Sequence, residues 1–157
     1  MNASRSWHPA PWSLPVTVRR ALVDMPIGYV VPPAPLRTGA AEKMKLCKPG
    51  MSLSQSTGSA GSFSWVRASL DRPCMTIQKK INFGGFSIWH PNEERALDAR
   101  ETARLGSWPD EFQFVGDYEA WIARIGNSVP PLFIRAIAWH IREFILTPIQ
   151  AQKECAV

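Results

Sequence analysis

The stretch that decides how this chain folds is RETARLGSWPDEF, residues 100–112, which Asp98 precedes by two positions. Asp98 and Glu101 form an acidic capping box, in which each side chain bonds a free backbone N–H of the other residue. A helix is therefore predicted to start at Ala99. Pro109 is predicted to end it, because the residue before a proline is pushed out of helical geometry.

The clearest periodic pattern lies near the C-terminus. Pro130 and Pro131 are expected to open a helix, since proline suits the first helical turn, and Pro148 is expected to close it. Apolar residues along it recur at i, i+3, i+4, i+7 and i+11: Ile134, Ile137, Ala138, Ile141 and Ile145. This pattern predicts an amphipathic helix whose apolar face needs a partner surface.

Three short runs in the middle of the chain have strand character. Phe63 and Trp65 alternate with polar residues, and Met-Thr-Ile at 75–77 and Phe-Ser-Ile-Trp at 86–89 are two further runs. The Asn-Phe-Gly-Gly cluster at 82–85 supplies turn chemistry between the last two. Together the runs predict a small antiparallel sheet and an α+β fold class.

The first part of the chain is predicted to be irregular. Seven of the 14 prolines fall within the first 35 residues, and proline disrupts both helices and central strands. Thr17 offers an N-cap for a short helix that Pro26 would stop. Residues 27–61 are rich in Pro, Gly and Ser without apolar periodicity, so residues 1–61 are expected to be mostly loops.

The net charge of +5 is concentrated in the first half. Residues 1–72 carry nine Lys/Arg against three Asp/Glu, whereas residues 73–157 carry nine against ten. A basic surface facing phosphates and a merely solvated basic surface both fit this pattern. The three cysteines lack metal-ligand spacing, and no signal-peptide core or membrane-spanning run is present, so a cytoplasmic protein with reduced thiols is expected.

Residues 100–112 and the following IGNSVPP, residues 125–131, resemble the ninth and tenth conserved blocks of cytosine-5 DNA methyltransferases in order and spacing. HPNEER at 90–95 is similar to the approach to the ninth block. Two residues differ from the family pattern. Asp98 stands where the family usually has Thr or Ser but keeps the capping role, and Trp108 stands where the family more often has Phe but is also aromatic.

The resemblance implies a division into residues 1–115, a target-recognition domain with a loop-rich part at 1–61, and residues 116–157. The second part would hold the tenth block and a helix that packs on a Rossmann-like cofactor domain absent from this chain. Double-stranded DNA is the implied partner, although no individual residue is assigned to DNA contact. The implied structural organisers of the ninth block are Arg95, Arg100, Glu101, Pro109 and Asp110, and the implied contacts to S-adenosyl-L-methionine, in an assembled enzyme only, are Asn127, Ser128 and Val129.

The family's catalytic motifs do not occur in the sequence. The nucleophile loop Pro-Cys-Gln is missing, and Pro73-Cys74 is followed by Met75 in a context that offers no cation or helix N-terminus to activate a thiol. His8, His90 and His140 are far apart and have no consistent partners, so His90 is interpreted as a positioning residue. No catalytic residue and no metal ligand is predicted.

These observations predict the DNA-recognition C-terminal part of an S-adenosylmethionine-dependent DNA cytosine-5 methyltransferase. It would be a separate subunit or a truncated fragment, inactive without a partner chain that carries the first eight blocks. The alternative is a stand-alone DNA-binding protein without enzymatic activity. The apolar stripe from Ile134 to Ile145 distinguishes them, because a self-sufficient protein should cover it.

Overall fold

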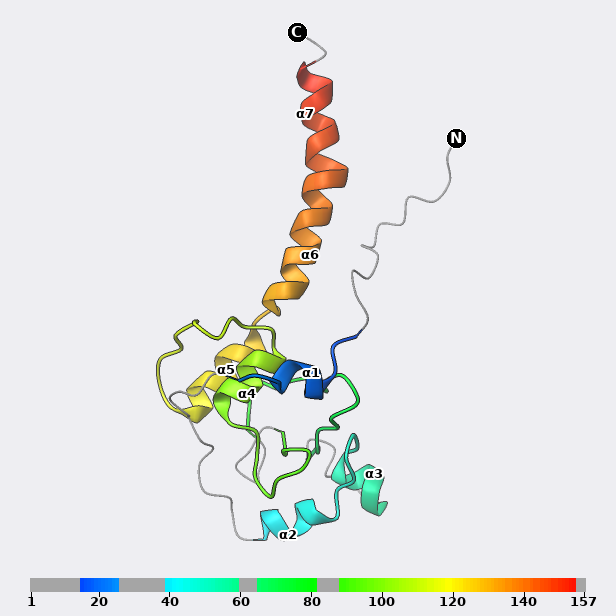
Figure 1. Cartoon of the computed structure of the whole chain (residues 1–157), viewed down its shortest axis with the longest axis vertical. Coiled ribbons are helices and arrows are strands. Elements are labelled where there is room, and N and C mark those ends of the chain that lie inside the picture. The colour runs from blue at the N-terminus through cyan, green and yellow to red at the C-terminus, as the bar shows by residue number, and fades with distance from the viewer. Residues whose placement is uncertain (1–14, 26–38, 60–64, 82–87, 155–157) are drawn as a thin grey trace. The chain divides into compact units, whose positions relative to one another are not determined.

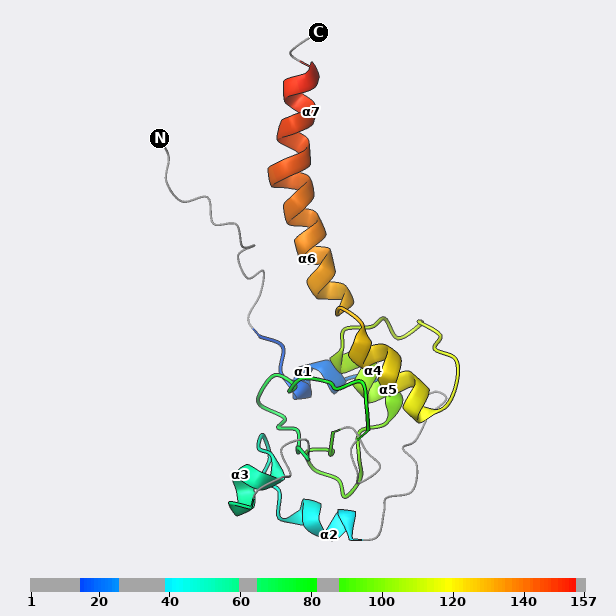
Figure 2. The same ribbon diagram turned by 180° about the vertical axis from the view of Figure 1, so that it is seen from behind.

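The structure, a computed structural model, describes residues 15–25, 39–59, 65–81 and 88–154. The chain divides into a unit formed by residues 15–128 and a second unit that contains the residues from Val129 onward. In the first unit, α4 contacts both α1 and α5, as two opposite views show (Figures 1 and 2). The functional boundary at residue 115 stays a prediction.

Helix α1, Val18–Leu22, begins as the sequence predicts. The Thr17 hydroxyl accepts a hydrogen bond from the Arg20 N–H at 3.3 Å, which satisfies one of the free donors of the first turn. The side chain of Val18 is fully buried, and its N–H donates to the Arg72 carbonyl at 2.9 Å. The helix is therefore tied to a segment about fifty residues further along the chain.

Helix α4, Ala99–Leu105, confirms the predicted start and its capping box. The Glu101 N–H donates to Asp98 Oδ1, and the Asp98 N–H donates to Glu101 Oε2, each at 2.8 Å. The helix ends at Gly106, before Pro109 is reached. A Cβ on Gly106 would lie 3.2 Å from Ile125 Cγ2, so this glycine allows the end of α4 to approach α5 closely.

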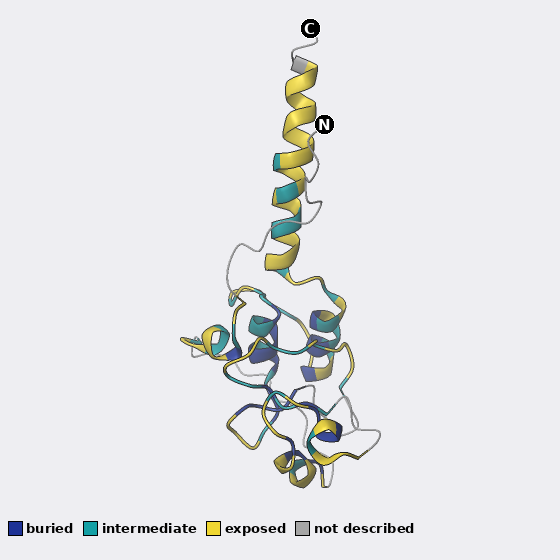
Figure 3. Ribbon diagram, turned by 90° about the vertical axis from the view of Figure 1, so that its right-hand side faces the viewer, coloured by how far each residue is buried: buried dark blue, intermediate teal, exposed yellow. Residues whose placement is uncertain are grey.

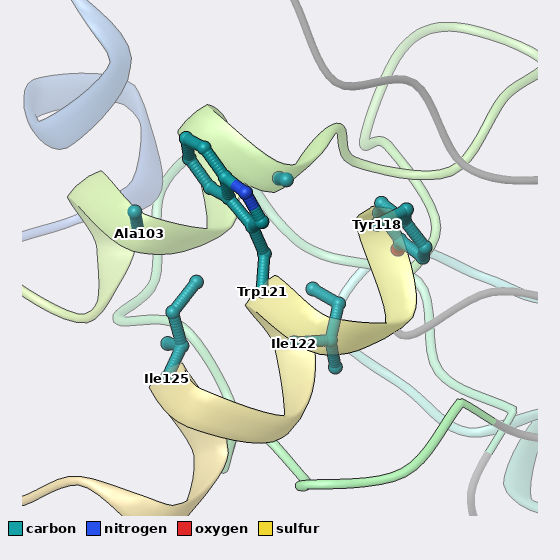
Figure 4. Close-up of a cluster of buried hydrophobic side chains, with 6 residues drawn as sticks. Ala103, Tyr118, Trp121, Ile122 and Ile125 are labelled. Carbon is teal, nitrogen blue, oxygen red and sulfur yellow. The ribbon is translucent and has the colours of Figure 1, made fainter. Parts of the chain in front are cut away.

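Helix α5, Tyr118–Asn127, was not predicted. Its signal is nevertheless in the sequence: the Asp117 carboxylate caps the Ala120 N–H at 2.9 Å, and apolar residues follow at helical spacing. Trp121 and Ile125 project from α5 toward the helix that carries Ala103 (Figure 4). This α4–α5 cluster consists of six buried residues: Ala99, Ala103, Tyr118, Trp121, Ile122 and Ile125.

Two short helices occupy the region that was expected to be loops. Helix α2 spans Ala40–Lys45, and helix α3 spans Leu53–Thr57. A capping box between Ser52 and Gln55 starts α3, which is a sequence signal that the Gly/Ser-rich composition obscured. Residues 40–45 and 53–57 are therefore helical where loops were expected, while residues 1–14, 26–38 and 60–61 lie outside the described residues.

The predicted antiparallel sheet is wrong, and with it the α+β class. The described residues form helices and loops, with three single-residue bridges: Ser52–Val66, Arg67–Trp89 and Trp89–Ala96. Trp89 pairs once on each side, and the chain then reaches Pro91, which cannot donate to a ladder. Residues 75–77 do not form a strand, and Phe63 and Phe86 lie outside the described residues.

The predicted C-terminal helix is present and continues past its expected end. Helix α6, Pro131–Ile141, leads through the π-helical turn η1, Arg142–Leu146, into α7, Thr147–Glu154. Pro148 was expected to close the helix. The π turn instead places it second in α7, where a missing N–H costs little. Within the described ranges, no helix combines the length and apolar character needed to cross a bilayer.

Candidate functional site

The segment around HPNEER is a narrow hairpin within the first unit. The Leu97 N–H donates to the Ile88 carbonyl and the His90 N–H to the Arg95 carbonyl, both at 2.8 Å. Ile88 and Leu97 pack into one buried cluster, whereas Trp89 and Ala96 pack into another. The hairpin therefore joins two parts of the core. Its position depends on the side-chain interactions that connect it to neighbouring residues.

Arg95 and Glu101, two of the predicted organisers, form the central ion pair of this region. Arg95 Nη1 and Nη2 each donate to one Glu101 carboxylate oxygen at 2.7 Å, a bidentate arrangement that fixes distance and orientation. Glu101 is only 7% exposed, and the guanidinium of Arg95 is the opposite charge that compensates its burial. The two carboxylates, Glu101 first, raise the pKa of Arg95 above its ordinary value.

Glu93 completes the network, although sequence reasoning did not assign it a role. Its Oε2 accepts from Arg95 Nε at 2.7 Å, and Arg95 chiefly lowers the pKa of the Glu93 carboxyl. The signal that could have identified it is its place two residues before Arg95 in a tight hairpin. One guanidinium therefore holds both the tip of the hairpin and the first turn of α4.

His90 stabilises the tip of the hairpin through its ring. Nδ1 accepts from the Asn92 N–H at 3.2 Å and from the Glu93 N–H at 2.9 Å, so the proton of the neutral ring is on Nε2. Nε2 lies 3.5 Å from Glu93 Oε1 and 3.9 Å from Glu101 Oε1. Burial, then the nearby Arg95 charge, lowers the pKa of His90. Its predicted positioning role fits these contacts.

The remaining organisers lie on or after α4. Asp110 pairs with Arg104 at 3.1 Å, and Arg104 also donates to the Val23 carbonyl at 2.8 Å. Arg100 is half-buried on α4, whereas Pro109 is exposed and its carbonyl accepts from the Phe112 N–H. Arg95 and Glu101 are thus brought together directly, while Asp110 acts through a separate ion pair.

Asn127, Ser128 and Val129 follow one another where α5 ends. Asn127 is exposed, Val129 is 53% exposed, and the Ser128 hydroxyl donates to the Ile125 carbonyl at 2.7 Å. Neither Asn127 nor Ser128 caps α6, because the N-cap of this helix is Pro130 and no side chain bonds its first turn. Three exposed or half-buried residues in a row can form one wall of a ligand site, but they cannot enclose a ligand.

Cys74 does not have the surroundings of a nucleophile. It packs against the buried cluster that contains Val18 and Ile88, and burial raises the pKa of its thiol to about 11. Cys47 is fully buried, and burial likewise raises the pKa of its thiol. Both thiols are therefore protonated near neutral pH, and a protonated thiol is a poor nucleophile.

Comparison with known proteins identifies the family. Residues 37–143 match the model of C-5 cytosine-specific DNA methylases, and every predicted site residue lies inside this range. The chain belongs to this family. Enzymes of the family act on DNA and use S-adenosyl-L-methionine as the methyl donor.

Individual relatives give the same result over a shorter range. The chain is 42% identical over 81 residues to an assigned type II methyltransferase of Oceanobacillus iheyensis and 38% identical over 81 residues to one of Methanocaldococcus jannaschii. It is 36% identical over 74 residues to a type II methyltransferase of Haemophilus parahaemolyticus. These alignments cover 52%, 52% and 47% of this chain but only 18%, 24% and 19% of the relatives.

Proposed function

We propose that this chain is the C-terminal, DNA-recognising part of a DNA cytosine-5 methyltransferase, with the nucleophile and most of the cofactor site supplied by polypeptide outside this sequence. The observation that carries the proposal is the Arg95–Glu101–Glu93 network inside the family match. This network braces a hairpin and a helix without presenting a reactive group, as expected of a scaffold for recognition.

Charge supports DNA as the partner. The excess of six positive charges in residues 1–72 includes several exposed side chains on described segments: Arg20, Lys43, Lys48 and Arg72. Duplex DNA is held mainly through its phosphates, and Lys and Arg are the side chains that neutralise them. Cytosine-5 chemistry on a base removed from the helix stack then requires a thiolate from elsewhere, because Cys74 is protonated.

This chain would contact the cofactor on one side only. In an assembled enzyme, Asn127, Ser128 and Val129 would contact S-adenosyl-L-methionine, which supplies the transferred methyl group. The exposure of Asn127 and Val129 leaves them accessible for that role. The residues that enclose the cofactor would belong to the polypeptide that carries the first eight blocks.

The C-terminal helix supports the existence of such a partner region. No residue of α6 is buried, although its stripe includes Ile134 at 47% and Ile141 at 41% exposure. Apolar area of this kind is normally covered by another surface. A Rossmann-like cofactor domain, on a separate subunit or on other polypeptide outside this sequence, would cover it.

A complementation assay tests the proposal. The 157-residue chain and a polypeptide carrying the first eight blocks of a relative would be incubated separately and together with duplex DNA and tritium-labelled S-adenosyl-L-methionine. We expect label in DNA only in the mixture, and equal label when Cys74→Ala replaces the native chain. Methyl transfer by this chain alone would refute the proposal, and DNA binding without any transfer in the mixture would favour a stand-alone DNA-binding protein.

A further inference from the structure

Residues 75–81 form an irregular segment that is anchored to the core at both ends. Met75 and Ile77 pack against the cluster around Val18, Ile77 also reaches the α4–α5 cluster, and Ile81 packs against the latter. The four residues between these anchors are exposed: Thr76, Gln78, Lys79 and Lys80. The apolar residues therefore anchor the segment, and its polar and basic side chains are exposed to solvent.

Gly126 lies against the middle of this segment. It occupies the last turn of α5, where glycine is less favourable than alanine by about 1 kcal/mol. A Cβ built on Gly126 would lie 2.5 Å from the Gln78 carbonyl carbon and 2.6 Å from the Lys79 Cα, and would also meet the Lys79 nitrogen. Since backbone atoms cannot rotate away as side chains do, only glycine leaves room for residues 78–79 at this place.

Lys79 and Lys80 are two adjacent cationic side chains whose charges no nearby carboxylate among the described residues neutralises. In the part of the chain that the structure describes, Lys79 and Lys80 have no carboxylate within ion-pair distance. Two adjacent, exposed and uncompensated ammonium groups on a fixed backbone suit a partner with regularly spaced negative charges, such as DNA phosphates.

We infer that Thr76–Lys80 is a DNA-contact segment in which Lys79 and Lys80 bind backbone phosphates and Gly126 is the positioning residue that sets the segment's place. This inference rests on the proposed function and adds the residues that carry out part of it. It also explains the glycine of the tenth block: it accommodates the backbone of the recognition segment and does not form a turn.

The test is the salt dependence of duplex DNA binding by the full 157-residue chain. Each phosphate contact contributes roughly 0.9 to the slope of log affinity against log salt, so K79Q/K80Q should lower the slope by about 1.8. At 0.1 M salt this corresponds to an affinity about 60-fold weaker, if binding at 1 M salt is unchanged. K79R/K80R keeps both charges and should bind like the native chain. R135Q/K153Q removes two exposed charges from the C-terminal helices and should leave the slope nearly unchanged.

Gly126→Ala provides the second arm. We expect weaker DNA binding and a lower salt slope, even though alanine favours helix, because the added methyl group displaces residues 78–79. Equal losses in K79Q/K80Q and R135Q/K153Q, or no loss in K79Q/K80Q, would overturn the inference while leaving DNA recognition intact. If the native chain shows no salt-dependent DNA binding, the proposed function fails as well. Should G126A not fold, the lysine variants still decide the outcome.

Discussion

Two regions of the molecule differ in how far their side chains are buried. They are the hairpin with α4, residues 88–105, and the C-terminal helices, residues 131–154. In the first region, the apolar residues enter three buried clusters and the buried carboxylate of Glu101 has a bidentate partner. In the second, apolar side chains such as Ile141 remain exposed. Figure 3 accordingly colours most of the C-terminal helix as exposed. The first region can therefore be stable within its own unit, whereas the second has helical structure without burial.

The largest expected difference between the two regions comes from one substitution made in each. Ile122→Ala in α5 removes a fully buried side chain from the α4–α5 cluster and should lower the free energy of unfolding by about 3 kcal/mol. Ile141→Ala in α6 removes a side chain that is already 41% exposed and should cost less than about 0.5 kcal/mol. Urea unfolding followed by tryptophan fluorescence measures both. Equal costs would mean that α6 is buried in solution.

The next prediction concerns the ion pair. Arg95→Ala leaves the buried Glu101 carboxylate without its cation, and because Arg95 is itself partly exposed we expect a loss at the lower end for such pairs, about 2–3 kcal/mol. Glu93→Gln is the matched control, since it removes only the more exposed partner and should cost less than about 1 kcal/mol. If the two variants are equally stable in urea, the network does not brace the hairpin.

A smaller effect is expected at the start of α4. Asp98→Ala removes the acceptor for the Glu101 N–H and should destabilise the first unit by about 1 kcal/mol. Asp98→Asn keeps an oxygen acceptor, and burial raises the pKa of the Asp98 carboxyl, so this neutral variant should be close to native stability. Thermal unfolding would show the difference; an Asn variant as unstable as the Ala variant would contradict the capping role.

The smallest expected effect is a pH dependence from His90. Its pKa is lowered in the folded state, so the unfolded chain binds its proton first as pH falls through about 6.5. The stability that His90 contributes should therefore be present above the unfolded pKa of about 6.5 and be lost as pH falls below it; in the folded state Arg67 and Arg95 oppose protonation, and Glu93 and Glu101 favour it. His90→Ala should flatten this decline relative to a control His140→Ala. A native-like decline in His90→Ala would place its origin elsewhere.

Local signals in the sequence predicted the parts of the fold that depend on neighbouring residues. Thr17 and the Asp98–Glu101 box marked helix starts that the structure confirms, and the stripe from Ile134 to Ile145 marked the C-terminal helix. The same kind of signal was present for α5 and α3 but was not used. The family was also readable from residues 100–112 and 125–131, and the comparison confirms it.

Pairing between distant segments could not be predicted in the same way. Residues 75–77 have strand composition, yet they form no bridge to another described segment. Met75 and Ile77 instead pack against the core. Strand propensity describes a fit to a half-buried surface and not the presence of a neighbouring strand. For the same reason, the close approach of residues 78–79 to Gly126 could not be predicted from the sequence.

By itself, the sequence determined the family, the helix starts and the uneven charge, because these depend on residue order and short-range hydrogen bonding. Only the tertiary structure decided that Arg95 joins Glu93 to Glu101, that the half-buried Cys74 has a raised thiol pKa, and that Gly126 meets the backbone of Lys79. Each of these facts is a contact between separated parts of the chain. Burial and partner geometry, which set the charge state and position of such groups, exist only once the chain has folded.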